Sequence, residues 1–334
     1  MPKVDPITLS VVLGTLETTQ REMTLALEKT SRSSVLNLAR DYSTTIFNSA
    51  PEMILQGQDI PIHLGSFMPA MKAVADFFCE DINEGDLILH NDPAYQGSHI
   101  VDMCMYRPVF YKEKHVFWTA CKGHLTDAGG PVPASYNPEA TEIFAEGLRI
   151  PPIKLWDKGK PQDDILNMVL TNMRARRDQE GDFRALIGSC QVGERNLINM
   201  LDKYGLDEVN LCIDELLSMA DRHMRSLIKE IPDGNYSGTA ILEDAGHGLG
   251  DMEITANLTI KDDICDIGII SPPQVPYFIN SYEGNSYSGV YLGLMMFAQL
   301  HPPYNEGLYR CVNVNMGPKG TLCNAEAPAP HVNC

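Results

Sequence analysis

Two β-rich runs separated by a short polar turn constrain the fold of this chain most strongly. Residues 101–111 and 115–121 are rich in β-branched and aromatic residues, and only Lys112, Glu113 and Lys114 separate them. This pattern predicts an antiparallel hairpin, in which directly opposed residues share one face of the sheet. The turn contains neither Gly nor Asn, so its geometry stays open at this stage.

Two His-x-x-Asp pairs flank the open end of this hairpin. The first is His99 with Asp102, and the second is His124 with Asp127. In a hairpin centred on Glu113, Asp102 faces His124, because both lie equally far from the centre. By the same reasoning His99 faces Asp127. Since opposed Cβ atoms lie about 4.5–5.5 Å apart, we expect these four side chains to converge.

Imidazole and carboxylate groups together form a donor set for Zn²⁺, Mn²⁺ or Fe²⁺. A set without Cys is more typical of catalytic sites, which keep one position open for water, than of closed structural zinc sites. The alternative is a cluster that binds nothing, because Asp92 and Asp127 are in typical turn positions. His63, in a loop before a predicted helix, is a candidate pocket residue, although a structural role fits its position equally well.

The other elements predict an α+β fold with mixed, mainly antiparallel sheets, a long N-terminal helix and a helical middle segment. Helical periodicity extends over residues 6–37, and a mostly helical segment covers 164–230. Further elements are expected at 41–47, 66–81, 85–90, 237–243, 252–260, 264–271 and 287–300. The Pro-Asp-Gly sequence from residue 232 predicts a boundary between a metal-site domain, 1–232, and a β-rich domain, 233–334. A doubly wound nucleotide-binding fold is not expected, because strands and helices do not alternate regularly and no GxGxxG or Walker A motif occurs.

Composition limits the class of partner. The chain has 44 acidic and 26 basic residues and a net charge of -18, which disfavours nucleic acid and anionic membranes. No apolar run approaches the roughly 20 residues of a membrane span, and residues 1–7 do not resemble a signal peptide. The 9 cysteines are spread along the chain without a CxxC pair, as is typical of reduced thiols. We therefore expect a cytoplasmic protein.

Several motifs resemble those of the hydantoinase B family. That family includes the B-type subunits of ATP-dependent N-methylhydantoinases, the related half of 5-oxoprolinases, and subunits of acetone and acetophenone carboxylases. The resemblance runs nearly from end to end. The matching stretches are Asp5-Pro6-Ile7-Thr8, Arg40-Asp41-Tyr42-Ser43, Asn91-Asp92-Pro93, Gly97-Ser98-His99 with Asp102, Gly123-His124, Asp127-Ala128-Gly129-Gly130, Glu146-Gly147-Leu148-Arg149-Ile150-Pro151-Pro152 and Gly181-Asp182.

The resemblance implies a site for one divalent metal, Zn, Mn or Fe, with four ligands: Asp41, His99, Asp102 and His124. Asp41 enters only through this resemblance, since its place in the sequence otherwise marks the start of a strand. Asp127 is retained as a ligand or as a partner that orients one. Asp127 or His63 is our hypothesis for the acid/base group.

The resemblance also implies a division of labour between two subunits. An A-type subunit with an actin/sugar-kinase-like fold uses ATP and Mg²⁺ to phosphorylate a substrate oxygen. The B-type subunit then completes hydrolysis of a cyclic amide or carboxylation of an activated enol. The lack of a phosphate-binding motif in this chain agrees with that division.

We therefore predict a metal-binding subunit of an ATP-dependent cyclic-amide hydrolase, acting on a hydantoin- or oxoproline-like substrate in a hetero-oligomer with an A-type subunit. Two alternatives stay open: a subunit of an acetone- or acetophenone-type ketone carboxylase, and a non-catalytic scaffold of such a complex. The family usually continues past residues 324–330, so we expect the 233–334 domain to be truncated relative to it. Residues 266–274 diverge from the family's Asp-Phe-Ser-Gly-type pattern, which leaves the substrate open.

Overall fold

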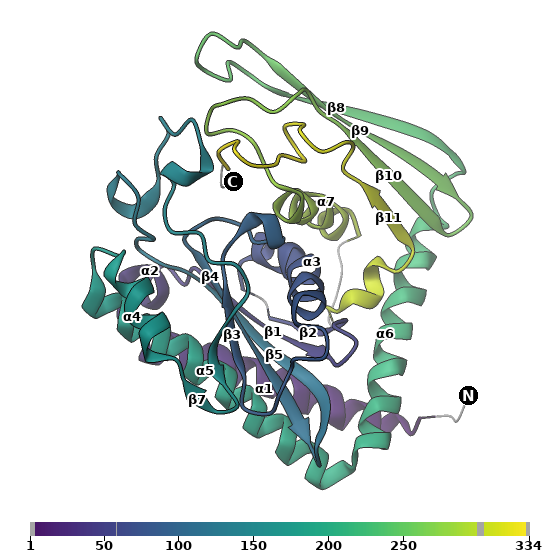
Figure 1. Ribbon diagram of the computed structural model, residues 1–334. Helices are drawn as coiled ribbons and strands as arrows, with labels where there is room; N and C mark the ends of the chain where they lie inside the picture. The colour runs from purple at the N-terminus through teal and green to yellow at the C-terminus, as the bar shows by residue number, and fades with distance from the viewer. Residues whose placement is uncertain (1–3, 58, 299–303, 332–334) are drawn as a thin grey trace.

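A seven-stranded sheet forms the centre of the molecule (Figure 1). The computed structural model describes residues 4–57, 59–298 and 304–331. The strand order is β2-β1-β5-β4-β3-β6-β7, and each neighbouring pair is antiparallel. The strands are β1 (Tyr42–Asn48), β2 (Met53–Gln56), β3 (Leu87–His90), β4 (Asp102–Tyr111), β5 (Lys114–His124), β6 (Ile153–Asp157) and β7 (Lys160–Pro161).

Helices cover both faces of this sheet. They are α1 (Pro6–Thr30), α2 (Ser34–Asn37), α3 (Pro61–Phe78), α4 (Asp163–Thr171), α5 (Arg176–Tyr204), α6 (Leu206–Ile228) and α7 (Glu283–Ala298). Helices α1 and α5 lie side by side on one face, and α3 lies on the other (Figure 1). Gly193 lets α5 approach the sheet closely, because a Cβ there would stand 2.5 Å from Met23 Sδ and 2.6 Å from Thr119 Cγ2. The central strands are therefore buried on both sides.

A smaller, four-stranded sheet has the order β11-β10-β9-β8. Its strands are β8 (Gly234–Leu242), β9 (Met252–Lys261), β10 (Ile264–Ile270) and β11 (Val312–Asn315). Strands β10 and β11 are parallel, and the other pairs are antiparallel. Helix α7 packs on α3 and lies beneath this sheet, so it stands between the two sheets (Figure 1).

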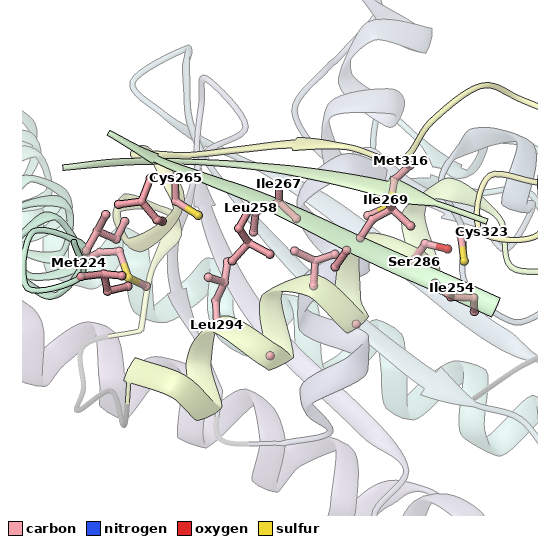
Figure 2. Close-up of a pocket in the computed structure, with 17 residues that line it drawn as sticks. Met224, Ile254, Leu258, Cys265, Ile267, Ile269, Ser286, Leu294, Met316 and Cys323 are labelled. Atoms are coloured by element: carbon pink, nitrogen blue, oxygen red, sulfur yellow. The ribbon is translucent and has the colours of Figure 1, made fainter. Parts of the chain in front are cut away.

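An apolar cavity of about 520 Å³ lies between α7 and the smaller sheet (Figure 2). Leu258, Ile267 and Ile269 point into it from the strands, and Leu294 points into it from α7 (Figure 2). Its described lining includes no imidazole and no carboxylate. This cavity therefore lacks the imidazole and carboxylate donors that the sequence predicts for the metal site.

The predicted α+β class with mainly antiparallel sheets is confirmed, with differences at element boundaries. The helix expected over residues 6–37 is interrupted, because α1 ends at Thr30 and α2 begins at Ser34. At the break, Asp182 Oδ1 accepts hydrogen bonds from the backbone N–H groups of Arg32 (2.7 Å) and Ser33 (3.0 Å). A carboxylate from a distant helix thus satisfies groups that a continuous helix would have bonded internally.

Other boundaries differ in smaller ways. The helical segment 164–230 divides into α4, α5 and α6, and the short strands β2, β6, β7 and β11 are not among the predicted elements. Residues 299–300 of the helix predicted over 287–300 lie outside the described residues. The domain division at residue 232 stays a prediction. Strand β8 begins close to that point, yet buried side chains from both sides of it, Ile88 and Ile267 among them, belong to one apolar cluster.

The β4–β5 hairpin reaches the predicted register by a different route. Its turn residues are Lys112 and Glu113, which both have positive φ angles of 50° and 67°, so the centre lies between them rather than on Glu113. The register then shifts by one residue between Val109 and Phe110. This bulge brings Asp102 opposite His124, as predicted. The ladder ends with that pair, so the predicted pairing of His99 with Asp127 is wrong.

Two further predictions concern membrane spans and the state of the cysteines. The described helices include none whose length and hydropathy would suit a membrane span. Within the described residues every cysteine is a free thiol, and most are buried in the apolar core.

A candidate metal centre at the open end of the hairpin

Three chain segments meet where the hairpin opens. Strand β5 ends with His124, strand β4 begins with Asp102, and Asp41 directly precedes β1. The backbone N–H of His124 donates to the carbonyl oxygen of Asp41 over 3.0 Å. Because β5 lies between β1 and β4 and neighbouring strands are about 4.8 Å apart, the sheet places one Asp on each side of His124.

His99, Asp102 and His124 form the centre of the cluster. Each offers one ligand atom, and these atoms lie within 4.8 Å of one another. The carboxylate Oδ1 of Asp102 is 2.9 Å from His124 Nδ1, and the rings of His99 and His124 have centroids 5.3 Å apart. His99 comes from the loop before β4, so the convergence predicted for these three residues is present.

Asp41 and His63 lie beside these three residues and extend the cluster. Asp41 Oδ2 lies 3.9 Å from His124 Nδ1. His63, in the first turn of α3, places Nε2 3.5 Å from Asp41 Oδ1 and 3.9 Å from Asp102 Oδ2. The residue that only the family resemblance indicated therefore lies beside the residues that the hairpin indicated.

Burial and neighbouring charges shift the pKa values of these side chains. It lowers the pKa of His63 and of His99 to about 3, so both imidazoles are neutral at pH 7 and carry a free lone pair. Burial opposes ionisation of Asp102, but the hydrogen bond with His124 and the neighbouring imidazoles hold the pKa of Asp102 well below its usual range. Burial likewise opposes protonation of His124, whose pKa is nevertheless raised by Asp102 and Asp41.

The donor set fits a divalent transition metal. His99 Nδ1 is buried and has no hydrogen-bond partner among the described residues, and a buried imidazole nitrogen without a partner is unfavourable unless something binds it. Imidazole and carboxylate donors suit Zn²⁺, Mn²⁺ or Fe²⁺ better than Ca²⁺.

Asp127 lies apart from this set. Its Oδ1 accepts a hydrogen bond from the guanidinium of Arg174 over 2.6 Å, and its Oδ2 accepts from the backbone N–H groups of Arg174 (2.9 Å) and Gly129 (3.2 Å). The structure thus shows Asp127 holding the loop after β5 against the start of α5. Its role in metal binding or catalysis stays a prediction.

Sequence reasoning also missed Tyr136 and His331, which lie near His99. Tyr136, from a Gly/Pro-rich loop, presents its ring edge-on to His99 at 6.2 Å between centroids. His331 is fully buried, with Nε2 unpartnered within the described residues, and its backbone N–H donates to Glu146. No local pattern could reveal this contact, because it joins segments 185 positions apart. The family motif around Glu146 indicated only one of the two residues.

This chain belongs to the hydantoinase B/oxoprolinase family, which it matches over residues 5–334. It is 70% identical to caprolactamase subunit beta of Pseudomonas jessenii, over 100% of this chain and 58% of that protein. It is 28% identical to the 5-oxoprolinase of Dictyostelium discoideum, over 70% of this chain and 18% of that protein. The chain thus spans 58% of the length of the caprolactamase subunit.

Two solved structures share the fold. The crystal structure of ATP-dependent caprolactamase from Pseudomonas jessenii superposes with a TM-score of 0.95 and 70% identity, covering 99% of this chain and 57% of that one. The nucleotide-free structure of acetone carboxylase superposes with a TM-score of 0.88 and 18% identity, covering 98% and 45%. The second likeness shows a common fold alone.

Proposed function

We propose that this chain is the metal-binding subunit of an ATP-dependent cyclic-amide hydrolase of the cytoplasm, and that its substrate is a lactam. The observation that carries the proposal is the His99/Asp102/His124 cluster in a chain 70% identical to a caprolactamase subunit. Asp41, His99, Asp102 and His124 would hold one Zn²⁺, Mn²⁺ or Fe²⁺. When bound, such an ion supplies Lewis acidity toward a water or a carbonyl oxygen.

The protein's own groups supply the rest of the chemistry. His63 is the better candidate for acid/base work, because its Nε2 faces Asp41 and Asp102 within the cluster. Every oxygen of the Asp127 carboxylate already accepts a hydrogen bond from Arg174 or Gly129, which makes it a positioning group for the surrounding loops. An A-type subunit would use ATP and Mg²⁺ to activate the amide.

Turnover by the assembled complex tests this proposal. The subunit, purified with its A-type partner, is given ATP, Mg²⁺, caprolactam and labelled bicarbonate. We expect ring opening to the amino acid, with no label in the product. In a parallel reaction with acetone in place of caprolactam, label in a carboxylated product would instead establish the carboxylase alternative. Full turnover by a metal-depleted complex would establish a scaffold role and overturn the catalytic metal.

A further inference from the structure

A lysine lies directly behind the metal cluster. Lys122 precedes His124 by two positions on β5, and alternate residues of a strand point to the same face. Its side chain is fully buried, although Lys is among the residues least often buried without a partner. In the ladder it pairs with Ser43 of β1 and with Cys104 of β4. It therefore lies in the sheet beside the metal residues and next to Phe67 of α3.

The contacts of Lys122 lead to both sides of the cluster. Its Nζ donates to Ser98 Oγ over 2.9 Å and also to Ser66 Oγ, and it lies 4.9 Å from the ring centroid of Phe67. Ser98 in turn donates to Asp102 Oδ2 over 2.6 Å. Ser66 donates to the carbonyl oxygen of His63 over 2.9 Å.

An ammonium group fixes the direction of both chains of hydrogen bonds. It has three donors and no acceptor, so each serine hydroxyl must accept from it and donate its own proton elsewhere. Ser98 can then only donate to Asp102. Because Asp102 Oδ2 also accepts from the backbone N–H of His99 over 3.2 Å, that oxygen is occupied, and Oδ1 is left to face His124.

We propose that Lys122 is the positioning residue of the metal centre. Through Ser98 it fixes the orientation of the Asp102 carboxylate toward the metal ligands, and through Ser66 it holds the turn of α3 that carries His63. This inference rests on the proposed metal site and deepens it. A group that orients a ligand in this way typically contributes about 10- to 100-fold to metal affinity.

The test is the affinity of purified protein for Zn²⁺, measured by competition with a chromogenic chelator. Lys122→Met keeps the length of the side chain but removes its donors, and we expect binding to weaken about 10- to 100-fold. Ser98→Ala breaks only the chain to Asp102, and we expect about a 10-fold loss. Lys154→Met is the matched control, because this half-buried lysine pairs with Asp81 and Asp86 instead; its affinity should equal that of the wild type.

Three results would overturn the inference. A folded Lys122→Met protein that binds Zn²⁺ within about twofold of the wild type, well short of the expected loss, would show that the lysine is merely structural. If that variant fails to fold, an unchanged affinity of Ser98→Ala leads to the same conclusion. A wild-type protein that binds no metal would remove the metal site itself, and with it the role of Lys122; this outcome is distinct, because it appears before any substitution is made.

Discussion

The strands of the two sheets differ in how deeply they are buried. In the seven-stranded sheet, helices cover both faces, and even Lys122 and Thr119 are fully buried with hydrogen-bond partners. In the four-stranded sheet, α7 covers one face, β8 is exposed along nearly its whole length, and an apolar cavity stays open beneath the strands. The candidate chemistry lies on the first sheet, where packing on both sides helps to hold the buried donors in one geometry.

The uncovered face of the smaller sheet carries polar side chains beside the exposed Ile241 and Ile270. Hydroxyl and amide side chains pair across its strands, with Thr239 opposite Thr255 at 2.9 Å and Ser237 donating to Asn257 over 2.8 Å. Such cross-strand pairs stabilise a solvated sheet face by roughly 0.2–1 kcal/mol each. These surface terms add to the apolar packing on the covered face, where Ile267 belongs to the same cluster as Ile88.

Matched leucine truncations test this contrast and carry the largest expected effect. Leu89→Ala, in fully buried β3, removes packed methyl groups and should lower the free energy of unfolding by about 3–5 kcal/mol. Leu258→Ala, beside the open cavity, should lower it by only about 1 kcal/mol, because its side chain is partly exposed. Urea denaturation measures both values. Equal losses would show that the smaller sheet is packed as tightly as the larger.

The pH dependence of stability tests how the segment around His331 is joined to the loop between β5 and β6. Glu146 is buried and accepts the backbone N–H of His331, and burial raises its pKa from 4.5 to about 8. The folded state therefore keeps a proton that the unfolded state releases above about pH 4.5. This contribution to stability is complete below pH 4.5 and is lost as the pH rises to 8.

Glu146→Gln should remove that dependence, because an amide does not titrate. We expect the variant to gain stability relative to the wild type as the pH rises from about 5 to about 8, the window set by the raised pKa. Denaturant unfolding at both pH values measures the gain. Parallel profiles for the two proteins would contradict a protonated Glu146 in the folded state.

Substitutions in the hairpin turn have the smallest expected effect on the free energy of unfolding. Lys112 and Glu113 adopt positive φ angles, which disfavour residues with a Cβ by roughly 1–2 kcal/mol and favour Asn-Gly in a two-residue turn. The double substitution Lys112→Asn/Glu113→Gly should raise the free energy of unfolding by about 1 kcal/mol, visible as a higher urea midpoint. A lower midpoint would argue against this turn geometry.

The sequence predicted the central part of the site because strand pairing is a local rule. Alternating β-rich runs and one turn were enough to bring Asp102 opposite His124 and to place His99 nearby. The turn centre was wrong, and the bulge near Val109 compensated for it. Asp127 could not be placed, because its partner Arg174 lies 47 positions away, in the turn between α4 and α5, which no local pattern connects to the hairpin.

Long-range contacts also explain what was missed. In the sequence, Lys122 resembles any charged residue near the end of a strand. Its burial beneath α3 depends on how that helix docks, which no local pattern shows. Asp41 was found only through the family motif, because its approach to His124 needs the β1–β5 pairing. The helix break at Arg32 depends on Asp182, 150 positions away. Hydrophobic periodicity therefore predicts which elements form, but not which distant polar groups complete them.

Metal content tests the central claim most directly. The wild-type protein and a His99→Ala/His124→Ala double variant are purified in parallel, incubated with excess Zn²⁺, Mn²⁺ or Fe²⁺, desalted and analysed by mass spectrometry. Circular dichroism confirms that both are folded. We predict about one equivalent of metal in the wild type and none in the variant. No metal in either protein, or equal metal in both, would contradict a metal centre built on these histidines.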